Sequence, residues 1–253
     1  MQANSKNALI IYCGLLSAVG AVSIDILMPV FGNMRAGFGV SMESVQLTIP
    51  VYTFFLGISQ FFMGTLSDRF GRRIIIIYGM SLYVIGGFIA ILYPSIEMVL
   101  FGRAIQGIGG GCGQVIARAM LRDTCSGREY SIALARVIAI FAIGPIIAPL
   151  IGAGLNMGDT WRPAFAFMIV FGLGLLAYSL FSLKETMVAK NFDALKISAM
   201  KDNFLVLVRD KKVLHLLLIG CSAKIALFSY LVNGAPVFEA EFEVVKMNFA
   251  LLF

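Results

Sequence analysis

Residues 46–93 read QLTIPVYTFFLGISQFFMGTLSDRFGRRIIIIYGMSLYVIGGFIAILY, two uncharged runs separated by a short charged segment. The runs extend from Gln46 to Leu66 and from Ile74 to Tyr93. A bilayer core about 30 Å thick needs about 20 residues of helix at about 1.5 Å each. Because a chain inside lipid must satisfy its own backbone hydrogen bonds, this stretch predicts two membrane-spanning helices joined at one surface.

The rest of the chain is equally apolar. Of its 253 residues, 59% are hydrophobic and 13% are charged, which leaves more apolar surface than a soluble fold of this size can bury. Uncharged runs from Val137 to Gly158 and from Pro163 to Leu183 add a fifth and a sixth span. Pro145 and Pro149 fall inside the fifth, but membrane helices tolerate proline when neighbouring helices satisfy the freed carbonyls. We therefore expect an all-α polytopic membrane protein.

The fourth span must enclose a charge. Fourteen uncharged residues separate Arg103 from Arg118, which is about 21 Å of helix and too short to cross the membrane. We expect this span to begin near Met98 and to carry Arg103 inside the membrane. A guanidinium in hydrocarbon costs on the order of several kcal/mol unless it has a partner or a watery cavity, so Arg103 is the strongest candidate functional residue.

Two more spans enclose a charge, and the end of the chain begins another. The first span, Ala8 through Phe31, contains Asp25, and the seventh, from Val213 to about Pro236, contains Lys224. An eighth apolar run, from Met247 to Phe253, stops after two turns. A helix that ended in mid-bilayer would leave its carbonyls unsatisfied, so we expect a C-terminally truncated chain.

A polar segment separates the first six spans from the seventh. The expected domains are an N-terminal six-span bundle at 1–183, a cytoplasmic linker at 184–212 and the start of a second bundle at 213–253. Apolar residues at helical spacing in the linker indicate an amphipathic surface helix, formed by Ala194, Leu195, Ile197, Met200, Phe204, Leu205 and Val208. The six spans divide into two sets of three, and the first helix of each set carries an ionisable residue, Asp25 or Arg103. These two helices run in opposite directions. Inverted repeats of this kind place substrate and ion sites between the repeats.

Lysine and arginine are distributed unevenly between the two sides of the predicted spans. The loops of one side contain three: Arg35, Arg162 and Lys246. The other side contains fifteen: Lys6, Arg69, Arg72, Arg73, Arg118, Arg122, Arg128, Arg136, Lys184, Lys190, Lys196, Lys201, Arg209, Lys211 and Lys212. Since the side rich in lysine and arginine is normally cytoplasmic, we expect a cytoplasmic N-terminus. This topology accounts for the net charge of +6 without a nucleic-acid partner.

Metal sites, disulfides and catalytic groups are not indicated. Cys13, Cys112, Cys125 and Cys221 form no CxxC or Cys/His pattern, and His215 is a lone histidine at the edge of the seventh span. No nucleophile with its base, metal cluster or phosphate loop stands out. We therefore expect neither an enzyme nor a bound cofactor or metal.

The charged segment between the second and third spans carries the most specific signal. It reads Gly64-Thr65-Leu66-Ser67-Asp68-Arg69-Phe70-Gly71-Arg72-Arg73. Its glycines permit a tight turn, its arginines hold the loop in the cytoplasm, and Asp68 can pair with a cation or with a helix N-terminus. The string resembles the cytoplasmic loop signature of the major facilitator superfamily, G-x-L-[AS]-D-[RK]-x-G-R-[RK]. The resemblance assigns that signature to Gly64, Asp68, Arg69, Gly71, Arg72 and Arg73.

Other stretches resemble the Bcr/CflA drug:proton antiporters of that superfamily, the bicyclomycin and chloramphenicol resistance group. They are Asp25 with Pro29, Gln46-Leu47-Thr48, Gly57 to Gln60, Leu100 to Gly111, Ala119 to Asp123, Gly144 to Gly154 and Trp161-Arg162. Ile26, where the family often has tyrosine, and Lys224, where a small or apolar residue is expected, depart from the pattern.

This resemblance implies a fold, a location and partners. The fold is two six-helix bundles around a central cavity. This chain would supply the first bundle and lack most of the second, which transport is expected to require. The location is the bacterial inner (plasma) membrane, in contact with the lipid bilayer. The partners are a small-molecule substrate and protons.

Asp25 and Arg103 are the candidate proton-coupling residues. Each lies about six residues inside the outer end of its span, so the two side chains are expected to meet across the cavity. A conformational change that alters their separation would decide whether the carboxylate holds a proton. The alternative is a permanent ion pair that only fixes helix packing.

The fifth span contains a stripe of small residues, Gly144, Ala148 and Gly152, that lets another helix approach closely. With Pro145 and Pro149 the stripe resembles the antiporter signature of the superfamily, which implies export, and ordinary helix packing is the alternative. Five polar side chains are candidates for lining a cavity: Thr48, Tyr52, Gln60, Gln106 and Gln114.

The function that the sequence favours is secondary active transport, in the form of proton-coupled efflux of drug-like or antibiotic compounds. A nutrient or metabolite symporter of the same superfamily is an alternative that should lack the glycine and proline stripe. A non-transporting multi-span membrane protein, such as a seven-span receptor, is another. The eighth apolar run and the Gly64 to Arg73 segment argue against it.

Overall fold

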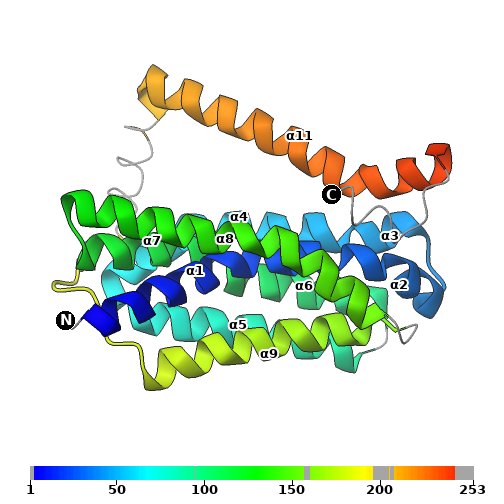
Figure 1. Cartoon of the computed structure of the whole chain (residues 1–253), viewed down its shortest axis with the longest axis horizontal. Helices are drawn as coiled ribbons and strands as arrows, with labels where there is room; N and C mark the ends of the chain where they lie inside the picture. Colours follow the sequence, from blue (N-terminus) through cyan, green and yellow to red (C-terminus); the bar gives the residue numbers. More distant parts are fainter. Residues whose placement is uncertain (1–2, 94, 157–159, 196–204, 206–207, 243–253) are drawn as a thin grey trace. The chain divides into compact units, whose positions relative to one another are not determined.

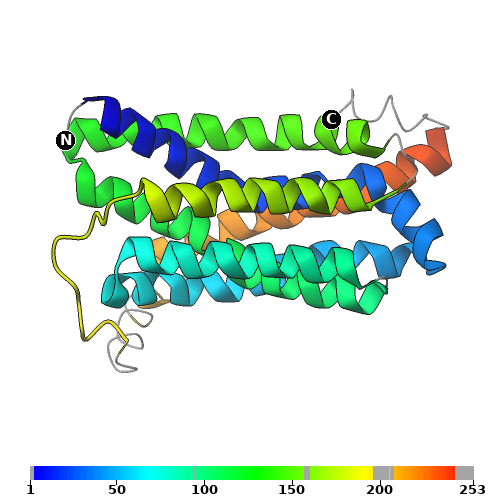
Figure 2. The same cartoon turned by 90° about the horizontal axis from the view of Figure 1, so that it is seen from below.

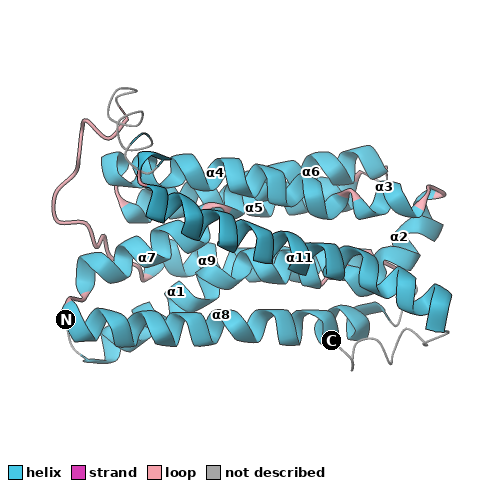
Figure 3. Cartoon of the chain, turned by 90° about the horizontal axis from the view of Figure 1, so that it is seen from above, coloured by secondary structure: helices cyan, strands magenta, loops and turns pink. Residues whose placement is uncertain are grey.

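A computed structural model of the chain describes residues 3–93, 95–156, 160–195, 205 and 208–242. Every regular element in those residues is a helix, and no strand occurs among them (Figure 3). The predicted all-α fold class is therefore confirmed. Contacts divide the chain into two compact units, Met1–Asn191 and Phe192–Phe253, and the boundary between them falls inside the predicted linker. The further division into a six-span bundle, a linker and a second bundle remains a prediction.

The long helices of the first unit run side by side along one direction (Figures 1 and 2). In chain order its elements are α1 (Ala3–Asp25), η1 (Met28–Val30), α2 (Phe31–Phe38), α3 (Met42–Gln46), α4 (Thr48–Phe70), α5 (Arg72–Leu92), α6 (Ile96–Gly110), α7 (Cys112–Thr124), α8 (Gly127–Leu155) and α9 (Arg162–Phe181). Helix α5 packs against α6 and α9, whereas α1 packs against α8.

Five stretches of the described residues are long and apolar enough to cross a membrane. They are Lys6–Phe38, Met42–Phe70, Arg72–Leu92, Gly127–Leu155 and Arg162–Phe181. These stretches correspond to the predicted first, second, third, fifth and sixth spans. The helix of the fifth span begins at Gly127 rather than at Val137, and the predicted end of that span, Gly158, lies outside the described residues.

The predicted fourth span is made of two helices, α6 and α7. Its start is close to the prediction, because Ser95 caps α6 by accepting the N–H of Met98 at 3.3 Å. Gly111 lies between the two helices but keeps helical backbone angles, with φ −61° and ψ −23°. Its N–H donates to the carbonyl of Gly107 at 3.1 Å. The two helices therefore continue one another with only a local break.

Close packing of α5 against α6 depends on facing glycines. A Cβ added at Gly86 would lie 2.5 Å from the carbonyl oxygen of Gly102, and one added at Gly102 would lie 2.5 Å from the carbonyl oxygen of Gly86. The two backbones therefore touch without intervening side chains. Small residues at helix contacts are typical of membrane proteins, where packing rather than water drives association.

The second unit contains α11 (Lys211–Phe242), which includes the predicted seventh span. The Lys224 side chain in this helix is exposed. The predicted eighth run, Met247 to Phe253, lies outside the described residues, as does most of the predicted amphipathic helix in the linker.

Candidate functional site

Arg103 is fully buried at the centre of the first unit, on α6. Its guanidinium donates three hydrogen bonds to oxygen atoms of three different helices. Nη2 donates to the carbonyl of Ser23 at 3.0 Å, Nε to the carbonyl of Thr48 at 3.3 Å, and Nη1 to Oε1 of Gln106 at 3.0 Å. The side chain thereby joins α6 to α1 and to the start of α4.

An aromatic ring completes the surroundings of this charge. The guanidinium carbon of Arg103 lies 4.0 Å from the centre of the Tyr52 ring, and Nη1 lies 3.8 Å from Sδ of Met168. A cation over a desolvated aromatic ring gains about 2 kcal/mol. Carbonyl dipoles and a π face therefore stabilise the Arg103 charge.

The predicted ion pair between Asp25 and Arg103 is not formed in this structure. Asp25 is the last residue of α1 and is buried, with 4% of its surface exposed. Within the described residues its carboxylate has no hydrogen bond or ion pair, and no carboxylate lies within 4 Å of Arg103. The physical reason is that backbone carbonyls and Gln106 already engage Nε, Nη1 and Nη2 of the guanidinium.

The link between the two residues runs through the backbone instead. Ser23, whose carbonyl accepts from Arg103, lies two positions before Asp25 on α1. The Ser23 hydroxyl also lies 2.6 Å from the hydroxyl of Tyr83 on α5. A movement of this end of α1 therefore changes the contacts of Arg103 and the surroundings of Asp25 together.

Three of the five predicted cavity-lining residues surround Arg103: Thr48, Tyr52 and Gln106 are all fully buried. Two buried side-chain atoms of the described residues have no hydrogen-bond partner, the Tyr52 hydroxyl and Nε2 of Gln106. These three residues therefore belong to a packed polar core in this conformation. Gln60 and Gln114 are partly exposed and lie outside the Arg103 contacts.

The Gly64 to Arg73 signature is mostly helical, so its description as a loop was wrong. Residues up to Phe70 form the last turns of α4, and α5 begins at Arg72. Only Gly71 separates the helices, and its φ of +113° is an angle that glycine adopts without strain. Gly64 makes no turn. It lies within α4, where an added Cβ would be 3.4 Å from the Val115 side chain.

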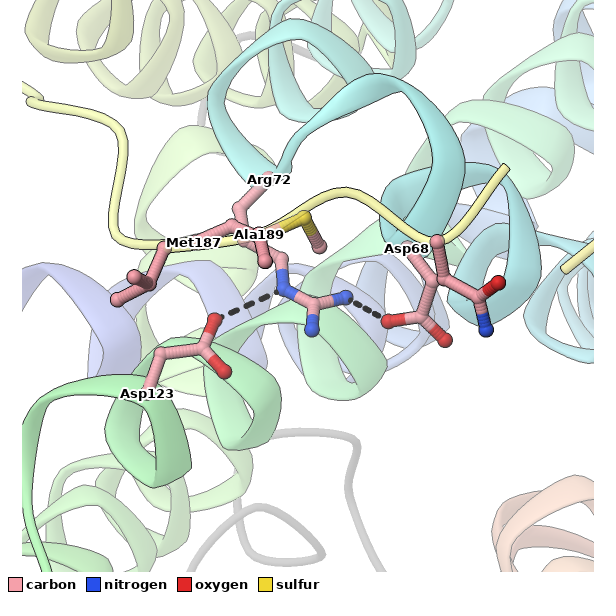
Figure 4. Close-up of a pocket in the computed structure, with 7 residues that line it drawn as sticks. Asp68, Arg72, Asp123, Met187 and Ala189 are labelled. Atoms are coloured by element: carbon pink, nitrogen blue, oxygen red, sulfur yellow. Dashed lines mark hydrogen bonds and ion pairs between the residues drawn. The ribbon is translucent and has the colours of Figure 1, made fainter. Parts of the chain in front are cut away.

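Charged groups from three helices meet at this junction (Figure 4). Arg72 is buried and donates from Nη1 to Asp68 at 2.6 Å and from Nε to Asp123 at 3.0 Å. Nη1 also donates to the hydroxyl of Ser67 at 2.7 Å. We call Asp68, Arg72 and Asp123 the charged triad. It ties the end of α4 and the start of α5 to the end of α7.

The other two arginines of the signature point elsewhere. Arg73 donates from Nε to the carbonyl of Ser179 at 3.0 Å and from Nη2 to the carbonyl of Leu180 at 2.6 Å, at the end of α9. The guanidinium of Arg69 lies 5.6 Å from the centre of the Phe70 ring. The three arginines therefore have separate partners.

Sequence reasoning missed two carboxylates that meet the signature. Asp123 ends the Ala119 to Asp123 stretch of the family resemblance, so its position in that stretch was a signal that could have found it. Glu185 binds backbone N–H groups at the start of α5 from 113 residues away in sequence, and no local pattern marks that contact.

The small-residue stripe of the fifth span faces α1. Gly144, Ala148 and Gly152 are buried, and an added Cβ at Gly144 would lie 3.5 Å from the Val22 side chain. Gly152 approaches the backbone carbonyl of Ile26 directly. Pro145 and Pro149 are partly exposed, and α8 continues through both of them as a helix. The opposite side of α8 exposes Ile138, Ile143, Ile146, Ile147 and Leu150.

Membrane-length helices packed around a buried polar core define a multi-pass membrane protein. The family model described as "Major Facilitator Superfamily" matches residues 13–253, so the chain belongs to the major facilitator superfamily.

Curated relatives have modest identity and are longer than this chain. The "Bicyclomycin resistance protein homolog" of Haemophilus influenzae is 28% identical over 255 aligned positions, which cover 100% of this chain and 63% of the relative. "Multidrug resistance protein D" of Escherichia coli K12 is 33% identical over 160 positions, which cover 63% of this chain and 41% of the relative. The chain thus spans less than two thirds of the length of each of these relatives.

Solved structures share the fold at low sequence identity. The human organic anion transporter MFSD10 (TETRAN) matches with a TM-score of 0.69 and 17% identity, covering 99% of this chain and 68% of the other. The peptide transporter POT, as its E310Q mutant in complex with alafosfalin, matches with a TM-score of 0.59 and 17% identity. It covers 83% of this chain and 44% of the other chain.

Proposed function

We propose that this chain forms part of a secondary active exporter that moves drug-like or antibiotic compounds outward in exchange for protons. The observation that carries the proposal is the buried, unpaired Asp25 carboxylate two residues from the Ser23 carbonyl that binds Arg103. The names of the relatives, bicyclomycin resistance and multidrug resistance, support the substrate class.

In this mechanism Asp25 carries the proton, and the distance of the Arg103 guanidinium from Asp25 influences whether the carboxylate is protonated. A buried carboxylate without a partner is most stable when it is protonated, whereas a carboxylate that meets water or a guanidinium is stable when ionised. Rocking of α1 against α6 would move Asp25 between these surroundings. Proton uptake in one access state and release in the other then couples the proton to the substrate.

The contact between α1 and α8 supports an exporter whose helices move as intact helices during the conformational change. The stripe on α8 allows these two helices to pack closely, and the two prolines leave carbonyls of α8 without their usual helical donors. The charged triad holds the ends of α4, α5 and α7 together, so these helix ends would move as one block. A second bundle is the partner against which this block rocks.

The proposed location is the bacterial inner membrane, with a cytoplasmic N-terminus. The lysine and arginine distribution supports this orientation, since the junction between α4 and α5 and the start of α8 lie on the basic side. The charged triad is then at the cytoplasmic surface, and Arg103 is nearer to the outer surface.

Proton release induced by substrate tests the proposal. Full-length protein purified in detergent should release protons when an exported drug is added at a fixed pH. Asp25→Asn should reduce this release to the background, because an amide cannot exchange the proton. The control is Glu97→Gln, which neutralises an exposed carboxylate in the first turn of α6.

Unchanged proton release in Asp25→Asn would reject Asp25 as the coupling residue. The direction of transport separates the exporter from a symporter of the same superfamily. In proteoliposomes with an imposed pH gradient, an exchanger moves substrate against the direction of proton flow, whereas a symporter moves both in the same direction.

A further inference from the structure

Residues 183–191, which follow α9, lie across the junction between α4 and α5, and we call them the proximal linker. The carboxylate of Glu185 in this linker accepts four backbone N–H groups. Oε1 accepts from Arg72 at 3.0 Å, Thr186 at 3.0 Å and Met187 at 3.1 Å, and Oε2 accepts from Arg73 at 3.1 Å. One side chain thus binds the first two N–H groups of α5 and two from its own segment.

This arrangement stabilises the start of α5. The first four N–H groups of a helix have no partner within the helix, and the N-terminus carries a partial positive charge. An ionised carboxylate there forms charge-assisted hydrogen bonds, which are stronger than neutral ones. Gly71 leaves room for it, since an added Cβ at that position would lie 2.6 Å from Oε2 of Glu185.

Two further contacts join the proximal linker to the charged triad. The hydroxyl of Thr186 donates to Oδ2 of Asp123 at 3.4 Å, the same oxygen that accepts from Nε of Arg72. The N–H of Asn191 donates to the backbone carbonyl of Asp68 at 2.9 Å. The linker therefore contacts all three members of the triad.

Arg73 joins the start of α5 to the end of α9, the helix that precedes the proximal linker. Its guanidinium binds the carbonyls of Ser179 and Leu180, which lie in the last turn of α9, where the helix carries a partial negative charge. The Arg73 guanidinium thus stabilises the carbonyl end of α9, and the Glu185 carboxylate of the proximal linker stabilises the amide end of α5.

The proximal linker also closes one side of a hollow beside the triad (Figure 4). The hollow has a volume of about 380 Å³ and is lined by Asp68, Arg72, Asp123, Met187, Val188, Ala189 and Asn191. Arg72 reaches Asp68 and Asp123 across this space, so the position of its backbone decides whether it meets both carboxylates.

From this geometry we infer that Glu185 is a positioning residue for the charged triad. It holds the first turn of α5 so that the guanidinium of Arg72 lies between Asp68 and Asp123. The proximal linker and the triad then move as one unit. Its effect on transport rests on the proposed function, whereas its effect on α5 does not.

Amide hydrogen exchange in the full-length protein tests the contact without any transport. In Glu185→Ala, a peptide covering residues 71–78 should exchange roughly tenfold faster, since helix caps of this kind are worth that much locally. Glu185→Asp keeps a carboxylate and should restore most of the protection. The control is Glu129→Ala, an exposed glutamate paired with Lys6 at 2.7 Å, which should leave this peptide unchanged. Unchanged exchange in Glu185→Ala would overturn the inference.

Drug transport into proteoliposomes then tests positioning. Glu185→Ala should lower the turnover number by about tenfold and leave KM unchanged, because Glu185 is remote from Arg103. Asp123→Asn should also lower the turnover number. In the double variant Glu185→Ala/Asp123→Asn the two reductions in turnover should not multiply, since both substitutions act through Arg72. Faster exchange with wild-type turnover, or with losses that multiply, would reject the positioning role. A wild-type protein that exports no drug would reject the proposed function, and the exchange result would still decide whether Glu185 holds α5.

Discussion

The fully buried Arg103 side chain connects three helices of the first unit. Arg103 contacts α1 through the Ser23 carbonyl, α4 through the Thr48 carbonyl and the Tyr52 ring, and its own helix through Gln106. In the described residues this charge is met by dipoles and an aromatic face instead of a carboxylate. The Arg103 charge therefore has its partners without Asp25.

Arg103→Lys tests whether the shape of this group matters as well as its charge. Lysine keeps the charge but loses the planar fork that reaches Ser23, Thr48 and Gln106 at once. Each lost hydrogen bond to a charged group costs about 1.5–3 kcal/mol, so we expect a clearly lower melting temperature in detergent and loss of transport. Arg118→Lys, on an exposed position of α7, is the control and should melt as the wild type does. A wild-type melting curve for Arg103→Lys would show that charge alone is sufficient.

Pairs of helices in this unit are held together by direct backbone contact. The α5 and α6 pair meets at Gly86 and Gly102, and Gly152 of α8 approaches the carbonyl of Ile26, the residue that follows α1. Backbone contacts of this kind leave no flexible side chain that can move aside. Each of these pairs is therefore expected to keep a fixed separation.

Gly86→Ala tests this rigidity at the level of one element. Its methyl group would lie 2.5 Å from the Gly102 carbonyl oxygen and 2.7 Å from the backbone nitrogen of Gln106, so α5 and α6 must separate. Overpacking of this kind costs about 1–3 kcal/mol. The melting temperature in detergent should fall accordingly. Gly174→Ala in α9 is the matched control, because an added Cβ there meets nothing within 4 Å and should not lower the melting temperature. Equal melting of both variants would contradict the packing argument.

Orientation in the membrane is a property of the whole molecule. The basic side contains the junction of α4 with α5 and the start of α8, and the opposite side contains α2 and the start of α9. The bias of fifteen lysine and arginine residues against three predicts which side faces the cytoplasm. In the proposed function the direction of transport depends on this orientation, because the proton gradient has a direction.

Cysteine labelling in intact cells tests the orientation. In a protein whose four native cysteines are replaced by serine, Ala36→Cys in α2 should react with a membrane-impermeant thiol reagent from outside. Ser126→Cys, which is exposed just before α8, should react only after the membrane is permeabilised. Labelling of Ser126→Cys in intact cells would reverse the proposed topology.

The membrane fold and the family could be predicted from sequence, because span length and hydrophobicity are local properties that each segment carries by itself. For the same reason the sequence shows the Gly64 to Arg73 signature and the position of Arg103 inside a span, because the uncharged run after Arg103 is too short to cross the membrane. The hydrogen-bond partners of these side chains could not be predicted from sequence, since every residue type has a backbone carbonyl that can accept. The tertiary structure alone decided that Arg103 binds Ser23 and Thr48 rather than Asp25, and that Glu185 caps α5.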